Sequence, residues 1–219
     1  MVDLIHGLLA ADVEANLAAV HQRIADAGRA PGEVQILAAV KYLPAEELAA
    51  LAQGGVTLAG ENRAQELVVK AQAHPEFTWD FIGALQSRKV PLILPHVRYI
   101  HSVATDSALA QLRRHGTPET RILVEVNVAG DPGKAGVTPA QLPGFLERCP
   151  VRVAGLMTMP PLAADPEDSR AHFASLRELA QAHGLHELSM GTSQDYGVAV
   201  EEGATIIRLG SALYRPGAS

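Results

Sequence analysis

A lysine stands at the end of an apolar run early in the chain. Lys41 directly follows the run Val34–Val40, and Pro44 begins a new element three residues later. An ammonium group is costly to remove from water, so a lysine at the end of a buried strand is usually kept for its nucleophilicity or for an anionic partner. The alternative is a side chain that merely extends to solvent at the strand end.

Two segments near the C-terminus have the residue types of a phosphate site. Ser189–Ser193 (Ser-Met-Gly-Thr-Ser) and Gly210–Ser211 combine glycines with hydroxyl groups. Glycine allows close approach to the backbone, and helix N-terminal amides together with hydroxyls hold a dianion without a metal. We therefore expect a phosphate cradle here, within reach of Arg208. The alternative for Arg208 is an ion pair with Glu201 or Glu202.

The elements that must position these groups alternate along the chain. Apolar residues at helical spacing from Leu4 to Ile24 predict a long N-terminal helix. After it, short apolar runs alternate with helical patterns in about eight pairs. The strands are expected at Val34–Val40, Val56–Ala59, Thr78–Ile82, Arg98–Ser102, Arg121–Val128, Val151–Met157, Leu185–Ser189 and Thr205–Leu209.

This alternation predicts the fold class. A closed (β/α)8 TIM barrel, an α/β architecture of parallel strands, is the standard arrangement for eight strand–helix pairs. An open doubly wound sheet is the alternative, but no Gly-x-Gly-x-x-Gly follows the first strand, so nothing supports a dinucleotide site. No linker or change in composition divides the chain, so we expect residues 1–219 to form a single domain.

A barrel would bring Lys41 and the cradle together, because sites in such barrels lie where the strands end. His101 also falls at a strand end, where a hydrogen-bonded structural role is the alternative to a role at the rim. His183 and His186 are spaced loosely like metal ligands, but we interpret them as a solvated helix end and expect no metal site.

Composition and charge exclude several classes of function. The chain has 219 residues, a formal net charge of −6 and 47% hydrophobic residues, which is ordinary globular composition. A nucleic acid or an acidic membrane surface would need a basic face, so neither is expected as a partner. The single cysteine, Cys149, fits a reducing compartment. No apolar run is nearly as long as a membrane helix, which needs about 18 residues, and the N-terminus lacks the basic residues of a signal peptide. We therefore expect a cytoplasmic protein.

Five stretches, in order along the chain, resemble a known family. They are Ala38–Tyr42, Gly60–Glu66, Trp79–Lys89, Gly155–Pro160, and Leu188–Ser193 taken with Ile207–Ser211. Together they are similar to the pyridoxal phosphate homeostasis protein family, small relatives of the alanine racemase barrel. The resemblance implies an alanine-racemase-like barrel that is preceded by an N-terminal helix and lacks the C-terminal β-domain of the racemases.

The resemblance also implies pyridoxal 5'-phosphate (PLP) as the cofactor, held as a Schiff base on Lys41. It places Asn62 beside the cofactor, Met157 along the ring and Arg208 at the pyridine nitrogen. The residues that hold the phosphate would be Ser189, Gly191, Ser193, Gly210 and Ser211.

Two positions depart from the family pattern. Asp80 stands where a histidine is frequent, and Thr192 replaces the usual methionine. If Asp80 points inward, it adds a negative charge near the face that is meant to receive the phosphate.

The family resemblance alone does not decide whether the protein stores PLP or uses it in catalysis. Racemases supply a second base, a tyrosine, from an additional domain, and none of the four tyrosines here lies in such a domain: Tyr42, Tyr99, Tyr196 and Tyr214. An arginine at the pyridine nitrogen disfavours its protonation and weakens the ring as an electron sink. We therefore expect a monomer that stores, buffers and delivers PLP, with apo PLP-dependent enzymes as candidate recipients. The alternatives are a PLP-dependent amino-acid racemase and a lysine Schiff-base aldolase that binds no PLP.

Overall fold

Eight parallel strands close into a barrel, in which each strand pairs with the next and the last pairs with the first. The structure is a computed structural model that describes residues 4–162 and 164–216. The strands are β1 (Gln35–Ala39), β2 (Leu58–Glu61), β3 (Thr78–Phe81), β4 (Tyr99–Val103), β5 (Arg121–Glu125), β6 (Arg152–Met157), β7 (Glu187–Thr192) and β8 (Ile206–Leu209). This closed parallel barrel confirms the predicted fold class.

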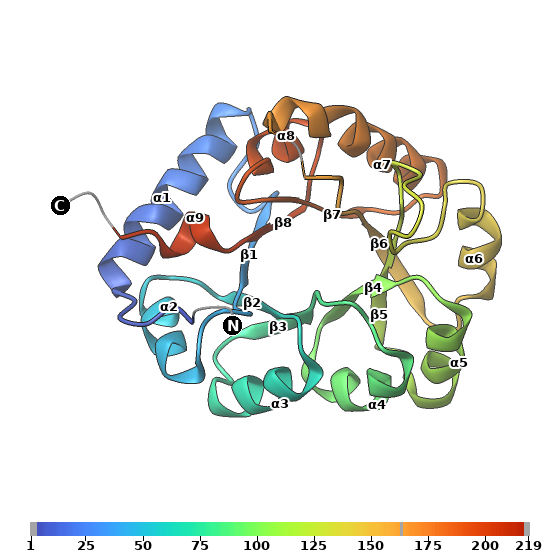
Figure 1. The fold of residues 1–219 in the computed structure, drawn as a ribbon, viewed down its shortest axis with the longest axis horizontal. Coiled ribbons are helices and arrows are strands. Elements are labelled where there is room, and N and C mark those ends of the chain that lie inside the picture. Colours follow the sequence, from blue (N-terminus) through green and yellow to red (C-terminus); the bar gives the residue numbers. More distant parts are fainter. Residues whose placement is uncertain (1–3, 163, 217–219) are drawn as a thin grey trace.

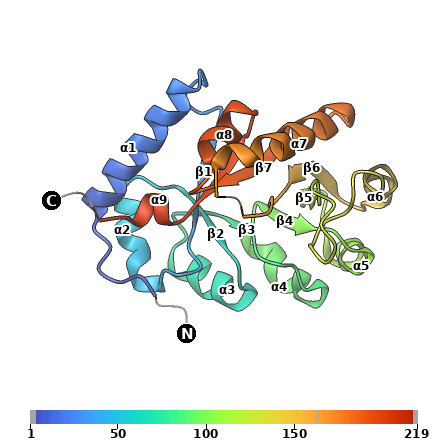
Figure 2. The ribbon, with the colours of Figure 1, turned by 45° about the horizontal axis from the view of Figure 1, so that its top comes forward.

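Helices form a ring around the strands, as Figure 1 shows. Helix α1 (Ala10–Asp26) precedes β1. The short α9 (Ser211–Tyr214) follows β8 and lies beside α1 in both Figure 1 and Figure 2. Between them lie α2 (Leu48–Gln53), α3 (Ala64–Ala73), α4 (Val90–Ile93), α5 (Asp106–His115), α6 (Leu142–Arg148), α7 (Arg170–Ala182) and α8 (Tyr196–Glu201). Within the described ranges, no helix combines the length and apolarity needed to cross a membrane.

Two apolar layers hold the barrel together. The larger fills the space between the strands and the helices, because each strand sends alternate side chains outward. The smaller fills the barrel interior and consists of Leu37, Leu58, Tyr99, Leu123, Met157 and Ile206. Met157 is only 3% exposed there, so it packs inside the barrel, whereas the sequence analysis expected it along a cofactor ring.

The N-terminal helix begins later than its apolar spacing predicts. Helix α1 starts at Ala10, although the helical pattern begins at Leu4. Gly7 has a φ of 72°, outside the helical region, and the Glu47 carboxylate accepts the backbone N–H groups of Gly7 and Leu8, each at 2.8 Å. These contacts across the chain hold the segment outside a helix, so the predicted start was wrong.

Strand β7 continues farther than the sequence analysis predicts. It was expected to end at Ser189 and to be followed by a loop, but it runs on to Thr192. Ser189 therefore lies within the strand, with no exposed surface. Gly191 has a φ of 90°, and a Cβ atom built on it would lie 2.6 Å from the Cβ of Ala199 in α8. Glycine here permits close packing of α8 against the strand.

Candidate functional site

A cavity of about 350 Å³ lies at the carboxyl ends of β1, β2, β7 and β8. Six of the nine expected site residues line it: Lys41, Asn62, Ser193, Arg208, Gly210 and Ser211. The other lining residues are Ile5, Ala39, Tyr42, Ile82, Met159, Thr192, Gln194 and Tyr214. The barrel thus brings Lys41 together with three residues of the expected cradle, Ser193, Gly210 and Ser211, because the carboxyl ends of parallel strands share one face of the barrel.

Lys41 stands at the mouth of this cavity. It follows the end of β1 at Ala39 by two residues, and its side chain is exposed. The Nζ atom lies 4.6 Å from the centre of the Tyr42 ring, close enough for a cation–π contact. The amine is therefore exposed to a ligand while the Tyr42 ring positions it.

A buried ion pair fixes the backbone next to Lys41. Lys70, from α3, donates from Nζ to Glu61 Oε2 at 2.6 Å and to the Val40 carbonyl at 2.9 Å. The other Glu61 oxygen, Oε1, accepts the backbone N–H groups of Asn62 at 2.6 Å and Arg63 at 3.1 Å. The Lys70 and Glu61 side chains are 3% and 1% exposed. One pair of charges therefore ties the ends of β1 and β2 together.

Asn62 carries hydrogen-bonding capacity that the protein itself does not use. Its Oδ1 atom is buried, and the described residues offer it no hydrogen-bond partner. A buried acceptor without a donor costs about 1–3 kcal/mol. Because Asn62 lines the cavity, a ligand in the cavity can satisfy its side-chain amide.

One hydroxyl group joins the part of the expected cradle after β7 to the part after β8. Ser193 Oγ accepts the backbone N–H groups of Gly210 and Ala212, each at 3.1 Å. These two N–H groups converge on the Ser193 hydroxyl oxygen, and N–H groups that converge in this way can also hold an anionic oxygen. The residues that follow β7 and β8 therefore meet at a site suited to a phosphate.

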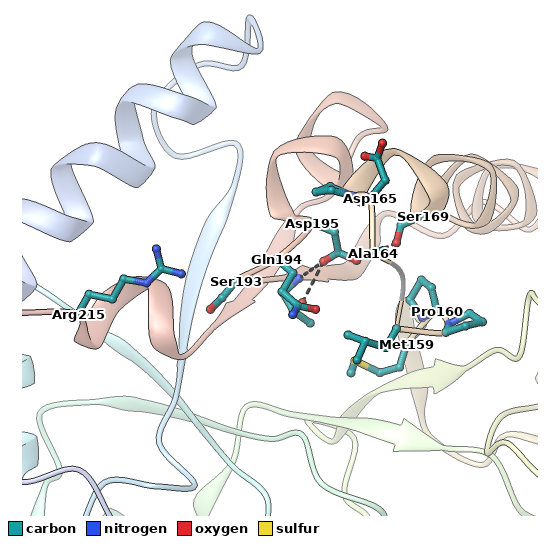
Figure 3. A pocket seen from close by; sticks show the side chains of 13 residues that line it. Met159, Pro160, Ala164, Asp165, Ser169, Ser193, Gln194, Asp195 and Arg215 are labelled. Atoms are coloured by element: carbon teal, nitrogen blue, oxygen red, sulfur yellow. Dashed lines mark hydrogen bonds between the residues drawn. The ribbon is translucent and has the colours of Figure 1, made fainter.

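A second hollow, of about 430 Å³, adjoins the first and is shown in Figure 3. The two hollows share Met159, Thr192, Ser193 and Gln194. In Figure 3 the Asp195 carboxylate accepts the Thr192 N–H of its own loop at 2.7 Å and the hydroxyl of Ser169, which directly precedes α7, at 3.0 Å. These bonds hold the loop that carries Ser193 in place between the two hollows.

Arg208 reaches the cavity from β8 and is 6% exposed. Its Nη1 donates to Ser189 Oγ at 2.5 Å, and its Nη2 donates to the Thr158 carbonyl at 2.9 Å. Glu201 and Glu202 instead pair with other arginines, including Arg170. The alternative interpretation of Arg208 as their ion-pair partner was therefore wrong.

The cavity is cationic. Lys41 and Arg208 line it, and its described lining contains no aspartate or glutamate. Burial lowers the pKa of Arg208 to about 10, against the opposing charges of Asp195 and Glu125, so the side chain stays protonated at neutral pH. The site therefore favours an anionic ligand.

Three expected residues lie away from the cavity, and several residues that the sequence analysis did not place in the site line it. Ser189 and Met157 lie inside the barrel, and Gly191 packs against α8. Ile5, Tyr42 and Tyr214 are among these additional lining residues. The sequence could have indicated Tyr42 as a lining residue, because it is the neighbour of Lys41. It could not have indicated Ile5, because the helical spacing around Ile5 predicted a helix. Tyr214 donates from its hydroxyl to the Ala39 carbonyl at 3.2 Å, and burial, together with the Glu61 charge, raises its pKa.

The segment that carries Ile5 is expected to detach on acidification. The hydrogen bonds from Gly7 and Leu8 lower the pKa of Glu47 from its ordinary value of 4.5. A lowered folded-state pKa means that the stabilisation is present above the ordinary value and is lost as the pH falls through the lowered one. Amide exchange should therefore show protection at Gly7 and Leu8 that falls below pH 4.5, while the protection within α1 persists.

Glu47→Gln provides the control for this acid-dependent detachment. A neutral amide oxygen accepts more weakly and does not titrate, so protection in the variant should be lower at every pH and independent of pH in this range. Equal protection of Gly7 in wild type at neutral pH and at about pH 3 would contradict the expectation.

Comparisons with known proteins identify relatives over most of the chain. The family model of the alanine racemase N-terminal domain matches residues 11–216. A pyridoxal phosphate homeostasis protein of Aquifex aeolicus is 38% identical over 203 residues, which cover 86% of this chain and 89% of that protein. PipY of Synechococcus elongatus PCC7942, solved with PLP bound, is 32% identical with a TM-score of 0.79, over 93% of this chain and 100% of the PipY chain.

A more distant structure shares the fold alone. An alanine racemase of Corynebacterium glutamicum is 14% identical with a TM-score of 0.72, over 100% of this chain and 66% of that chain. The matched family model and the identity to these relatives cover most of the chain. The chain belongs to the pyridoxal phosphate homeostasis protein family, which is built on the barrel of the alanine racemase N-terminal domain.

Proposed function

We propose that this protein binds PLP in the cavity at the ends of β1, β2, β7 and β8 and takes part in PLP homeostasis by storing, buffering and delivering it. The observation that carries the proposal is the meeting of Lys41 with the Ser193 cradle across one cavity. PipY, a relative at 32% identity, was solved with PLP bound, and the Aquifex aeolicus relative bears the name of a homeostasis protein.

The described residues fit this cofactor. The N–H groups of Gly210 and Ala212, now bonded to Ser193, are donors for a phosphate, and Asn62, which lines the cavity with Gly210, has an unused buried acceptor. The volume of about 350 Å³ falls within the roughly 300–1,000 Å³ of small-molecule sites. Lys41 supplies positive charge for an anionic ligand, as Arg208 does.

Lys41 is proposed to hold the cofactor covalently. Its side chain would supply the amine that condenses with an aldehyde, with loss of water. When bound, PLP supplies an aldehyde that reacts with amines and a ring that withdraws electrons from amino-acid carbanions. Arg208 would lie beside the ring nitrogen and would disfavour its protonation, because two positive charges would then be adjacent. A neutral ring is a weaker electron sink, which favours storage over turnover.

Incubation with PLP is expected to give wild-type protein a visible absorbance band that Lys41→Ala lacks. Lys134→Ala is the matched control, since Lys134 lies in an exposed loop and pairs only with Asp131 among the described residues. The sequence contains four lysines, so borohydride reduction followed by mass mapping can assign the adduct to one of them. We expect the reduced adduct on Lys41.

The outcomes of this experiment separate the possible functions. A wild-type protein with no band and no adduct would contradict PLP binding, and sugar-phosphate aldehydes would then be the ligands to test. A band together with a robust racemase or transaminase rate that Lys41→Ala abolishes would contradict storage and make the protein a PLP enzyme.

We further infer that the protein acts as a single-domain cytoplasmic monomer that passes PLP to apo PLP-dependent enzymes. The exposed Lys41 at the cavity mouth, the net charge of −6 and the single cysteine support this view. Light scattering of the loaded protein should give the mass of one chain, and mixing with an apo-transaminase should restore the activity of that enzyme. A stable dimer, or no transfer beyond that from an equal amount of free PLP, would contradict the respective inference.

A further inference from the structure

A line of polar side chains crosses the otherwise apolar barrel interior. Asp80 on β3, His101 on β4 and Ser189 on β7 have no exposed surface, and Arg208 on β8 is 6% exposed. They lie among the apolar residues that fill the barrel. Buried polar groups of this kind are costly unless each has its partner, so the pattern of their hydrogen bonds is informative.

The four side chains form one continuous chain of hydrogen bonds. His101 Nε2 lies 3.0 Å from Asp80 Oδ2, and His101 Nδ1 lies 2.9 Å from Ser189 Oγ. Arg208 Nη1 then donates to the same Ser189 Oγ at 2.5 Å. The far end is anchored by Arg98, whose Nη2 donates to Asp80 Oδ2 at 2.7 Å, and by the Tyr99 N–H, which donates to Oδ1 at 3.1 Å.

The chemistry of these groups fixes the direction of the chain. An ionised carboxylate only accepts, so the proton of the His101 ring lies on Nε2, and Nδ1 of a neutral ring must accept. The Ser189 hydroxyl therefore donates to Nδ1, which leaves its oxygen to accept from Arg208. Every donor in the line then faces an acceptor.

The electrostatics of the interior agree with these protonation states. Burial lowers the pKa of His101 and outweighs the opposing hydrogen bond and charge of Asp80, so the ring is neutral. Burial acts to raise the pKa of Asp80, but the hydrogen bonds from His101 and Arg98, together with the charge of Arg98, leave that pKa lowered. Asp80 is therefore ionised beside a neutral histidine.

We propose that Asp80 is a positioning residue for Arg208: acting through His101 and Ser189, it orients the hydrogen bond that holds the guanidinium group at the edge of the cofactor cavity. The consequence for PLP rests on the proposed function, since it requires the ring nitrogen to face Arg208. Asp80 thus acts on the cavity from inside the barrel. Its negative charge is balanced by Arg98 and is hydrogen-bonded by His101, so it does not oppose a phosphate in the cavity.

Asp80→Asn tests the proposal because asparagine keeps the shape and can donate as well as accept. If its amide turns its NH₂ group toward His101, the ring proton moves to Nδ1, and Ser189 Oγ then receives two donors, from Arg208 and His101. Long-range ¹H–¹⁵N spectra of the unliganded protein distinguish the two tautomers, with the His101 signal assigned by its loss in His101→Gln. We expect a neutral Nε2–H ring in wild type and an Nδ1–H population in Asp80→Asn.

Ser189→Ala cuts the line between His101 and Arg208 without touching Asp80. It should keep the wild-type tautomer, yet it should match Asp80→Asn in two further readouts. These are faster rotation of the Arg208 guanidinium group in ¹⁵N spectra, and a roughly threefold to tenfold weaker affinity for PLP with a shifted visible band, as expected for one lost or weakened hydrogen bond. Ser102→Ala, which loses another buried hydroxyl, bonded to the Gly83 carbonyl, is the control and should change neither.

Several outcomes would overturn the proposal. A wild-type His101 that is cationic or carries its proton on Nδ1 at neutral pH contradicts the direction of the line. Unchanged Arg208 rotation in both variants contradicts the positioning role, and Ser189→Ala alone decides this if Asp80→Asn does not fold. A wild-type protein without a visible band would contradict PLP binding instead, because the tautomer and rotation readouts need no cofactor.

Discussion

Replacing Lys70 with methionine is expected to lower the free energy of unfolding by about 3–5 kcal/mol. The substitution leaves the Glu61 carboxylate, 1% exposed, in the protein interior without its cation. It also removes the donor of the Val40 carbonyl. Without Lys70, the buried Glu61 charge keeps only the N–H groups of Asn62 and Arg63 as partners and has no counter-ion, which makes this loss larger than that of a surface ion pair. Urea unfolding at neutral pH, with the slopes compared, measures it.

Two further variants separate the buried charge from the loss of packing. Lys134→Met removes a lysine whose side chain is 40% exposed, and it should change stability by less than about 0.5 kcal/mol. Lys70→Met combined with Glu61→Leu removes both charges and should be less destabilised than Lys70→Met alone, although the N–H groups of Asn62 and Arg63 then lose their acceptor. A single variant as stable as wild type would contradict the role assigned to the pair.

The barrel could be predicted from the sequence because its strands are short and apolar on both faces. A strand that is covered by helices outside and packed inside reads as a nearly continuous apolar run, which periodicity detects easily. The same topology explains why six expected residues meet at one cavity. Each follows or ends a strand, and the carboxyl ends of the strands share one face of the barrel.

The errors in prediction arise where distant residues decide the local structure. The spacing of Leu4 and Leu8 is helical, but Leu4 is 50% exposed and the segment is held by Glu47, about 40 residues away, which no local pattern contains. Ser189 ended the predicted strand because it is polar. In the structure its hydroxyl is satisfied by His101 and Arg208 inside the barrel, so the strand continues past it.

Asp80 shows the same limit for the candidate site. Its type alone suggested a negative charge that would oppose a phosphate, and its orientation could not be derived from a single sequence. The structure places it beneath the cavity with Arg98 and His101 as partners. The effect of a charged residue on a site depends on its partners, and those come from strands that only the closed barrel brings together.

Gly83→Ala is expected to disturb both the stability of the fold and the placement of Asn62. A Cβ atom at Gly83 would lie 2.0 Å from the Asn62 carbonyl oxygen and 2.6 Å from its Cα, and both are backbone atoms that cannot rotate away. Overpacking of this kind costs about 1–3 kcal/mol, and sometimes more. The backbone that carries Asn62 must shift, so the side-chain amide leaves its place at the cavity.

Gly144→Ala is the matched control, with an effect of the opposite sign. Gly144 lies in α6, and a Cβ atom there would meet only the Arg148 guanidinium, at 3.4 Å. Alanine is preferred over glycine within a helix by up to about 1 kcal/mol, so this variant should be as stable as wild type or more stable. The comparison of the two urea midpoints therefore isolates the collision at Asn62 from the general effect of adding a methyl group.

A titration with PLP then tests the part that Asn62 plays in the site. If its amide contacts the cofactor, folded Gly83→Ala should bind PLP more weakly than wild type, whereas Gly144→Ala should bind it equally well. The loss should be reproduced by Asn62→Ala, which removes the amide without moving the backbone. Lower stability of Gly83→Ala with unchanged affinity would mean that the glycine serves the closure of the barrel alone, and that the unused acceptor of Asn62 is not part of the cofactor site.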